Sequence, residues 1–263
     1  MTSPLGRLGV QTFEDGAQRC SASIPVARLV NPLTGIPTVA TMAMIVDHVG
    51  GLLNHRRCGP DEYTVSSELS LELTPEAAAL IDAAPDTPVL TTSRPLGTKN
   101  ASALAACELA LDGHLVGTAS VRSFYIRAPG NVAGEWAVEP ADEDRPETLA
   151  DQMSVRVAEG GGTSVLVQSP DPAINNAMGI VHGGISATAL ELVASAALNN
   201  SRVGSPLHTA SLRVNYLRPF RSGADARYVG TALRAGRSTG VSDAQAIGAD
   251  GAVAIAARLT AYL

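Results

Sequence analysis

Two nearly uncharged segments, each interrupted by a single acidic residue, constrain the fold of this 263-residue chain most. Residues 36–53 carry Asp47 as their only formal charge, and residues 183–198 carry only Glu191. A helix that is apolar on all sides is a buried helix, and a carboxylate inside it is costly unless it is paired or used in chemistry. The sequence therefore predicts two buried central helices, with Asp47 and Glu191 as candidate catalytic groups.

The two segments belong to an internal repeat. Asp47 and Glu191 lie 144 positions apart, and the same spacing aligns residues 71–75 with residues 215–219 without a gap. Further along, two Asp-Gly turns align at a spacing reduced to 138, at residues 112–113 and 250–251. We expect the six extra residues of the first copy to form a short helix within residues 74–82, with Thr74 as its N-cap and Pro75 at its first position.

The repeat predicts two units of similar size, residues 1–128 and 153–263, separated by an acidic, proline-containing linker at residues 129–152. The second unit contains alternating runs that read as strands joined by short turns, at residues 164–168, 209–217, 224–233 and 252–262. Consecutive strands with tight turns favour an antiparallel sheet, and one buried helix has only that sheet to pack against. The predicted fold class is α+β, with two antiparallel sheets that each wrap around a long buried central helix.

Composition narrows the function classes. A net charge of −6 argues against a general binder of nucleic acid, and both apolar segments are too short and too interrupted for membrane insertion. The three cysteines form no CxxC pair, which indicates a cytoplasmic location, and the five histidines show no metal-ligand spacing. We therefore expect neither a metal nor a cofactor.

The sharpest local motif precedes the second buried helix, where Asn176 is followed by His182, Gly183 and Gly184. Two glycines at a helix start leave backbone N–H groups unobstructed at the positive end of the helix dipole. Such groups can hold a carbonyl oxygen or an oxyanion, although the same pattern also suits a plain glycine-rich turn.

With Glu191 nine residues after His182 and Thr209 eighteen residues after Glu191, the pattern resembles the hotdog-fold acyl-CoA thioesterases of the phenylacetate-type (PaaI-like) family. The resemblance covers residues 153–263 and, in degenerate form, residues 9–127. It implies a tandem, or double, hotdog that hydrolyses the thioester of an acyl-CoA.

In the resembled family, active sites lie between two hotdog units. The resemblance thus implies one site in which the Gly183 N–H polarises the thioester carbonyl, with Gly184 beside it. Asn176 would bind substrate or water, and His182 would brace the turn. Asp47 from the first unit would act as general base or nucleophile.

A second implied site joins Glu191 and Thr209 to the first copy's helix start. There Thr38, Val39 and Ala40 replace the His-Gly-Gly motif, so an oxyanion hole is not expected. Conversely, the 144-residue spacing places Val65 opposite Thr209, with Ser66 beside it, so the first site is expected to lack the hydroxyl group. We predict that the Asp47/Gly183 site is the more complete one.

Arg218 and Arg237, at strand ends, are the candidates for binding the phosphates of coenzyme A, because guanidinium groups bind phosphate through two parallel hydrogen bonds. The resemblance further implies that double-hotdog chains assemble into a homo-oligomer. The sequence leaves open whether the carrier is coenzyme A or acyl carrier protein, and which acyl chains are accepted.

Three alternatives stay open. Asp47 and Glu191 could be structural carboxylates that cap neighbouring loops. The protein could be a hotdog hydratase or dehydratase of enoyl thioesters, for which Asp47 and His48 form the only adjacent acid–histidine pair. It could also be a binding module for acyl-CoA without catalytic activity, as the degenerate first copy suggests.

Overall fold

A computed structural model describes residues 3–128, 145–158, 164–200 and 202–263. Most of the predicted linker, residues 129–144, lies outside the described residues. The remainder of that linker contains a short helix, α4, at Leu149–Gln152.

Each half of the chain contains a long helix and six strands among the described residues. The first half comprises α1 (Pro4–Arg7), β1 (Gln11–Asp15), β2 (Cys20–Ile24), α2 (Met42–His55), β3 (Glu62–Leu73), α3 (Ala77–Ala83), β4 (Val89–Pro95), β5 (Ser102–Leu111) and β6 (His114–Arg127). The second half comprises α4, β7 (Val155–Val157), β8 (Val165–Gln168), the 3₁₀ turn η1 (Pro172–Ile174), α5 (Gly183–Asn199), β9 (His208–Tyr216), β10 (Arg227–Ala235), β11 (Thr239–Ile247) and β12 (Val253–Tyr262).

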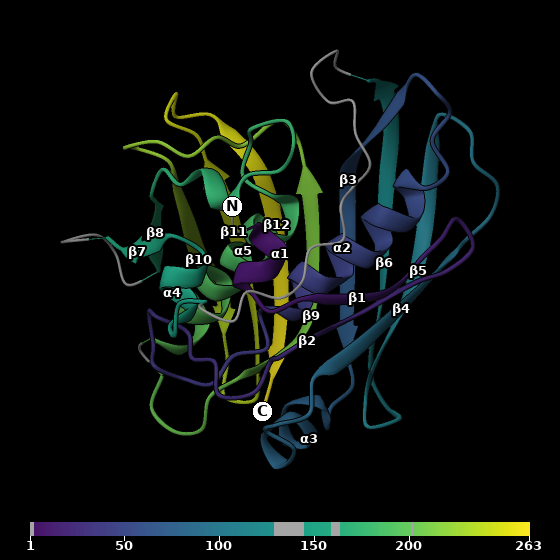
Figure 1. Cartoon of the computed structure of the whole chain (residues 1–263). Coiled ribbons are helices and arrows are strands. Elements are labelled where there is room, and N and C mark those ends of the chain that lie inside the picture. Colours follow the sequence, from purple (N-terminus) through teal and green to yellow (C-terminus); the bar gives the residue numbers. More distant parts are fainter. Residues whose placement is uncertain (1–2, 129–144, 159–163, 201) are drawn as a thin grey trace.

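The strands form one continuous sheet, in the order β1-β2-β4-β5-β6-β3-β9-β12-β11-β10-β8-β7. All of these pairs are antiparallel, and the order in the second half mirrors that in the first. The predicted architecture is confirmed, with the addition that its two sheets are joined where Glu68–Glu72 of β3 pair with Ser211–Asn215 of β9. Figure 1 shows this junction at the middle of the molecule, between the blue strands of the first half and the green and yellow strands of the second.

The two long helices fill the core and contact each other. Helix α2 lies against β2, β3, β4, β5 and β6, and Figure 1 shows β1 and β2 crossing it. Almost every side chain of α2 and α5 is buried. Helix α5 begins at Gly183 as predicted, but α2 begins at Met42 instead of near residue 36. The turn before α2 is too tight for an α-helix, because Met42, Ala43 and Met44 donate to carbonyls three residues back.

In the central strands, the spacing of the repeat is one residue shorter than predicted. Each carries a one-residue bulge, at Ser67 in β3 and at Ala210 in β9, which are 143 positions apart rather than 144. Buried residues follow the same spacing, since Leu69 in β3 corresponds to Leu212 in β9. The gapless alignment over these strands was therefore wrong, and a slip of one residue matters because it moves every side chain to the opposite face.

The short helix of the first copy also differs in its start. Helix α3 begins at Ala77 instead of after Thr74, and the Thr74 hydroxyl is buried without a hydrogen-bond partner instead of capping the helix. The Asp-Gly turn predicted at residues 250–251 lies in the connection between β11 and β12. Its counterpart in the first copy is tighter: Asp112 and Gly113 have φ values of 47° and 79° and connect the paired residues Leu111 and His114. Positive φ at both positions is the geometry of a type I′ hairpin turn.

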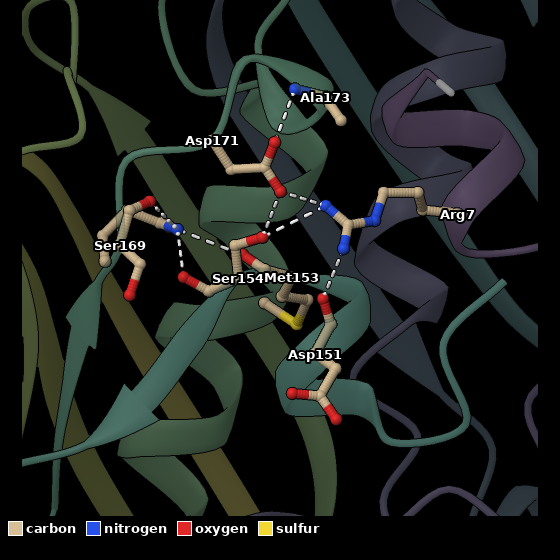
Figure 2. Close-up of polar contacts among 8 residues, drawn as sticks. Arg7, Asp151, Met153, Ser154, Ser169, Asp171 and Ala173 are labelled. Atoms are coloured by element: carbon tan, nitrogen blue, oxygen red, sulfur yellow. Dashed lines mark hydrogen bonds and ion pairs between the residues drawn. The ribbon is translucent and has the colours of Figure 1, made fainter. Parts of the chain in front are cut away.

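A polar network fastens the N-terminal helix to the second half of the chain (Figure 2). The Arg7 guanidinium on α1 forms an ion pair with Asp171 and donates to the Ser154 hydroxyl at 3.1 Å and to the Asp151 carbonyl at 2.8 Å. Asp171 also accepts from the Ala173 N–H at 2.9 Å, which caps η1. The ion pair thus holds the start of the loop that leads to α5.

This network continues into the core through Gln168. Its side-chain amide donates to the carbonyls of Met153 and Ser154 at 3.0 and 2.9 Å, and its oxygen accepts from the Tyr228 hydroxyl at 2.8 Å. Both Gln168 and Tyr228 are fully buried. A buried amide is stabilising only while its donors and acceptor are all satisfied.

We predict that Tyr228→Phe lowers the free energy of unfolding by about 1–3 kcal/mol, because it leaves the Gln168 oxygen buried without a donor. Urea denaturation measures the loss. Tyr262→Phe, at a residue that is 53% exposed, is the control and should change stability by less than about 0.5 kcal/mol. Equal stability of the Tyr228 variant and the wild type would contradict the prediction.

Candidate active site

The start of α5 meets the middle of α2 at a pocket of about 450 Å³, here named the Asp47 pocket. The first half of the chain contributes Asp47 and Gly51 from α2 and the beginning of β3, while the second half contributes the loop before α5, Gly183 and the segment after β9. The pocket therefore lies between the two halves, as the resemblance implied.

Asp47 is 6% exposed, and its environment is specific. Its Oδ1 accepts a hydrogen bond from the Ser66 hydroxyl at 3.0 Å. On the other side, a Cβ added to Gly183 would lie 2.8 Å from Asp47 Oδ2. Only glycine at position 183 therefore lets this carboxylate lie directly against the start of α5.

Gly184 has a different role from Gly183. A Cβ at this position would lie 2.4 Å from the sulfur of Met44 and 3.0 Å from its Cα. The second glycine thus allows α2 and α5 to cross closely, and the crossing brings Asp47 to the Gly183 backbone.

His182 caps α5. Its Nδ1 accepts a hydrogen bond from the Gly184 N–H at 3.0 Å, which requires that the proton of the neutral ring be on Nε2. Nδ1 also lies 3.5 Å from Asp47 Oδ2. Burial lowers the pKa of His182, although the nearby Asp47 opposes this, so the two side chains do not form an ion pair at neutral pH. The structure thus supports the predicted bracing role.

The Gly183 N–H has no hydrogen-bond partner among the described residues. It lies at the first position of a 17-residue helix, where the dipole favours an acceptor. The Gly183 carbonyl accepts from the Tyr216 hydroxyl at 3.2 Å, which fixes the peptide group from β9. Burial and the nearby Asp47 raise the pKa of Tyr216 well above its ordinary value, so this hydroxyl stays a donor.

The pKa of Asp47 is raised, chiefly by burial. The Ser66 hydroxyl and the Gly184 N–H act in the opposite direction by favouring the charged form, as does His182 when its ring is protonated. A carboxylate held in this way is more basic than one in water, and such groups are typical of catalytic sites.

Asn176 lines the pocket, but its side-chain oxygen is already used in the loop. It accepts from the N–H groups of Met178 and Ile180 at 2.9 and 3.4 Å. The side-chain amide N–H₂ has no partner among the described residues and is the group of Asn176 that can contact a ligand.

The remaining lining contains both charged and apolar side chains. Arg218 and Arg221 come from the segment after β9, and Tyr63, Val65 and Ile126 come from the start of β3 and the end of β6. Arg237 lies in the turn between β10 and β11 and does not line this pocket, so its predicted role in substrate binding lacks support. The location of Arg218 fits the prediction, and Arg221 is an arginine that the sequence argument passed over.

A second pocket of about 220 Å³, named the Glu191 pocket, lies at the start of α2. Glu191 is 3% exposed and accepts hydrogen bonds from three hydroxyls, those of Thr209, Thr38 and Ser195. Thr38 also accepts from the Ala40 N–H at 3.2 Å, as His182 accepts from the Gly184 N–H. The two pockets therefore share one construction.

Differences between the pockets are local. In the Glu191 pocket, Val39 replaces Gly183, and α3 covers one side through Ala78, Ile81 and Asp82. The Asn31 side chain donates to the Leu192 carbonyl at 2.8 Å, so it is engaged in the protein in a way that the Asn176 amide is not. Burial raises the pKa of Glu191 to about 7, against the pull of the three hydroxyls.

Ser66 is the site residue to which the spacing of the repeat assigned no role. The predicted spacing placed Val65 opposite Thr209, but the bulges place Ser66 there, and its hydroxyl bonds Asp47 as the Thr209 hydroxyl bonds Glu191. The Asp47 pocket therefore does not lack the hydroxyl group. The alternation of apolar and polar residues, in which Leu69 and Leu71 match Leu212 and Val214, was the sequence signal that could have revealed this register.

His48 does not join Asp47 in the pocket. It is 3% exposed, and its Nε2 lies 2.8 Å from the Thr12 hydroxyl, on a face of α2 away from the pocket lining. Burial lowers the pKa of His48 to about 3. The pair of Asp47 and His48 that the sequence offered for a hydratase is thus not assembled. Among the described residues, no group of three or more His, Cys, Asp or Glu side chains could hold a metal ion.

Comparisons with known proteins agree with this geometry. Residues 178–255 match the family model of the thioesterase superfamily. No curated protein matches the chain in sequence. Within the part of the chain that the structure describes, no helix has the length and apolar character needed to cross a membrane.

Solved structures resemble the whole chain. The tesB protein of Mycobacterium avium subsp. paratuberculosis superposes with a TM-score of 0.61 at 9% identity, covering 98% of this chain and 97% of that one. An acyl-CoA thioesterase II from Mycobacterium marinum gives a TM-score of 0.58 at 11% identity, covering 99% and 97%. A hotdog-fold protein of unknown function from Alicyclobacillus acidocaldarius gives 0.56 at 13% identity, covering 100% and 98%.

These likenesses establish the fold, while membership of the phenylacetate-type subgroup stays a prediction. The similarity in sequence falls on the half that carries Gly183 and Glu191, and the similarity in structure extends over both halves. The chain is therefore a double-hotdog protein whose residues 178–255 match the thioesterase superfamily.

Proposed function

We propose that the protein is an acyl-CoA thioesterase that hydrolyses its substrate in the Asp47 pocket. One observation carries the proposal: the unpaired Gly183 N–H and the buried Asp47 carboxylate meet at one pocket from opposite halves of the chain. A donor for a developing oxyanion and a base for water are the two groups that thioester hydrolysis needs.

In this mechanism, the thioester carbonyl accepts a hydrogen bond from the Gly183 N–H. Asp47 takes a proton from a water molecule as the water oxygen attacks the carbonyl carbon. The resulting oxyanion is stabilised by Gly183 at the positive end of α5. Collapse of the intermediate breaks the carbon–sulfur bond, and Asp47 returns the proton to the leaving thiolate, so that the products are the free acid and coenzyme A.

Other side chains position these two groups. Ser66 orients Asp47, Tyr216 fixes the Gly183 peptide, and His182 caps α5 through its neutral ring. The free amide of Asn176 binds the substrate or the water. Arg218 and Arg221, which line the pocket, bind the phosphates of coenzyme A.

The Glu191 pocket is the weaker candidate for the same reaction. Its volume is about half that of the Asp47 pocket, and α3 covers one side of it. Asp82 on α3 lines the pocket and would repel the phosphates of coenzyme A. Glu191 and Thr209 would then form a vestigial site, although the Val39 N–H is also without a partner among the described residues.

The proposed location in the cell is the cytoplasm. Cys20, Cys58 and Cys107 are all free thiols, which suits a reducing, cytoplasmic compartment. We further propose that double-hotdog chains assemble into a homo-oligomer.

We predict that Asp47→Asn lowers kcat/KM for acyl-CoA hydrolysis by at least about 100-fold, because the amide cannot accept the proton of water. Release of free thiol from short, medium, long and aromatic acyl-CoAs measures it, with Glu191→Gln assayed in parallel. A loss confined to the Glu191 variant would move the chemistry to the other pocket. Binding of acyl-CoA without any turnover by the wild type would favour a binding module.

Ser66→Ala should shift the acid limb of the pH–rate profile to higher pH. The Ser66 hydroxyl favours the charged form of Asp47, so its removal raises the pKa of the base further. The profile of kcat/KM between pH 5 and 9 reports this pKa. An unshifted limb with an unchanged maximum would show that Asp47 is not the titrating base.

Glu191 should make the protein less stable as pH rises. A pKa raised in the folded state from 4.5 to about 7 means that the stabilising protonated form is lost over that pH range. The free energy of unfolding should therefore fall by roughly 3 kcal/mol between pH 4.5 and 7 relative to Glu191→Gln. Urea denaturation of both proteins at several pH values measures the difference. The contribution of Asp47 titration cancels in this difference, because both proteins contain Asp47. Parallel profiles would contradict the prediction.

A further inference from the structure

Two adjacent glycines, Gly50 and Gly51, lie in the interior of α2, one turn after Asp47. Glycine in the interior of a helix costs about 1 kcal/mol relative to alanine, because it loses more backbone freedom on folding. Each position therefore needs a reason why a side chain is absent.

Packing explains Gly50 but not Gly51. A Cβ at Gly50 would lie 2.6 Å from a methyl group of Val121, so β6 occupies the space. A Cβ at Gly51 would meet nothing nearer than the Ser66 hydroxyl oxygen, at 3.9 Å. The helix would accept a side chain at position 51, and the space it would fill belongs to the Asp47 pocket.

The second pocket shows what a side chain at this place does. Ser195 occupies the position of α5 that corresponds to Gly51, since it follows Glu191 by four residues as Gly51 follows Asp47. Its hydroxyl accepts from the Asn31 amide at 3.1 Å and can donate either to the Leu192 carbonyl, at 3.2 Å, or to Glu191, at 3.5 Å. The pocket that contains Ser195 measures about 220 Å³, against about 450 Å³ for the pocket with Gly51.

The surroundings of Gly51 suit an apolar group. Ser66 is the nearest neighbour of a Cβ at Gly51, and the adjacent Val65 and the paired residues Tyr63 and Ile126 line the same pocket. An acyl chain whose carbonyl is held at Gly183 can therefore run along α2, past Gly51, against these side chains.

We propose that Gly51 determines the acyl-chain specificity of the Asp47 pocket: the missing side chain admits chains of about six carbons or longer. The proposal rests on the thioesterase function proposed above. Gly51 follows Asp47 by four residues, about 6 Å along the helix axis, which a zigzag chain of ~1.5 Å bonds covers in roughly five carbon atoms. Acetyl and butyryl groups end before this point.

The test compares wild type, Gly51→Ala and Gly51→Val on acyl-CoAs of two, four, eight and twelve carbons. We expect Gly51→Val to lower kcat/KM for the eight- and twelve-carbon substrates at least about tenfold and to change that for the two-carbon substrate much less, because the chain clashes only beyond position 51. Gly51→Ala should show a smaller effect of the same kind and a melting temperature no lower than that of the wild type.

Gly50→Ala is the matched control. Its Cβ meets Val121 instead of the pocket, so we expect a lower melting temperature with an unchanged ratio of long-chain to short-chain activity. An equal loss on all chain lengths for Gly51→Val, or no loss on any, would overturn the proposal. A wild type that accepts only two- and four-carbon chains would overturn it as well.

A binding measurement separates this proposal from the function it rests on. S-alkyl-CoA thioethers of the same four lengths cannot be hydrolysed, and titration calorimetry measures their affinity. If the wild type releases no thiol from any acyl-CoA, the thioesterase proposal fails. A selective loss of affinity for eight- and twelve-carbon thioethers in Gly51→Val would still support the role of Gly51, and equal affinities would overturn it.

Discussion

The close crossing of α2 and α5 is the contact on which the site depends. Gly184 lets the helices approach until its backbone lies against Met44, and Gly183 lets the Asp47 carboxylate lie against the first peptide of α5. A side chain at either position would separate the acid from the helix start. The sheet surrounds this crossing, so that burial raises the pKa of Asp47 while the helix start offers an unpaired N–H at the same pocket.

The same construction occurs twice with different outcomes. Each central helix buries a carboxylate, each carboxylate accepts from a strand hydroxyl, and each helix start has a side-chain cap. Burying a charge without use is costly. Burial raises the pKa of Glu191 to about 7, so that it exists partly as the neutral acid, while three hydroxyls stabilise its charged form. Asp47 accepts from fewer hydroxyls and lines a larger pocket. This arrangement is expected where a ligand, instead of the protein, supplies the remaining hydrogen bonds to the carboxylate.

The sequence predicts the features that depend on composition, but not those that depend on the exact register of strands and the position of turns. The uncharged segments with Asp47 and Glu191 predicted the buried helices, and the spacing predicted the duplication. Ser66 was assigned no role because the spacing between the copies falls from 144 at the helices to 143 at the strands, and a gapless alignment does not show this change of one residue. Thr74 was taken as a cap from residue type alone, but its hydroxyl bonds nothing in the described structure. Arg237 was placed near substrate because position along the chain does not show which end of a sheet a turn occupies.

Neither half of the chain could form the candidate site alone. Asp47 and Ser66 come from the first half, and Gly183 with its supporting residues comes from the second. The first half also steadies the second, because Arg7 on α1 holds Asp171, which caps η1, and the Ile174 carbonyl at the end of η1 accepts from the His182 N–H at 2.9 Å. A chain of contacts thus runs from the N-terminal helix to the residue that caps α5. Covalent linkage of the two units therefore does more than raise their local concentration. It lets the second unit keep the helix start and the first unit keep the base, so that the Glu191 pocket can diverge without loss of the Asp47 pocket.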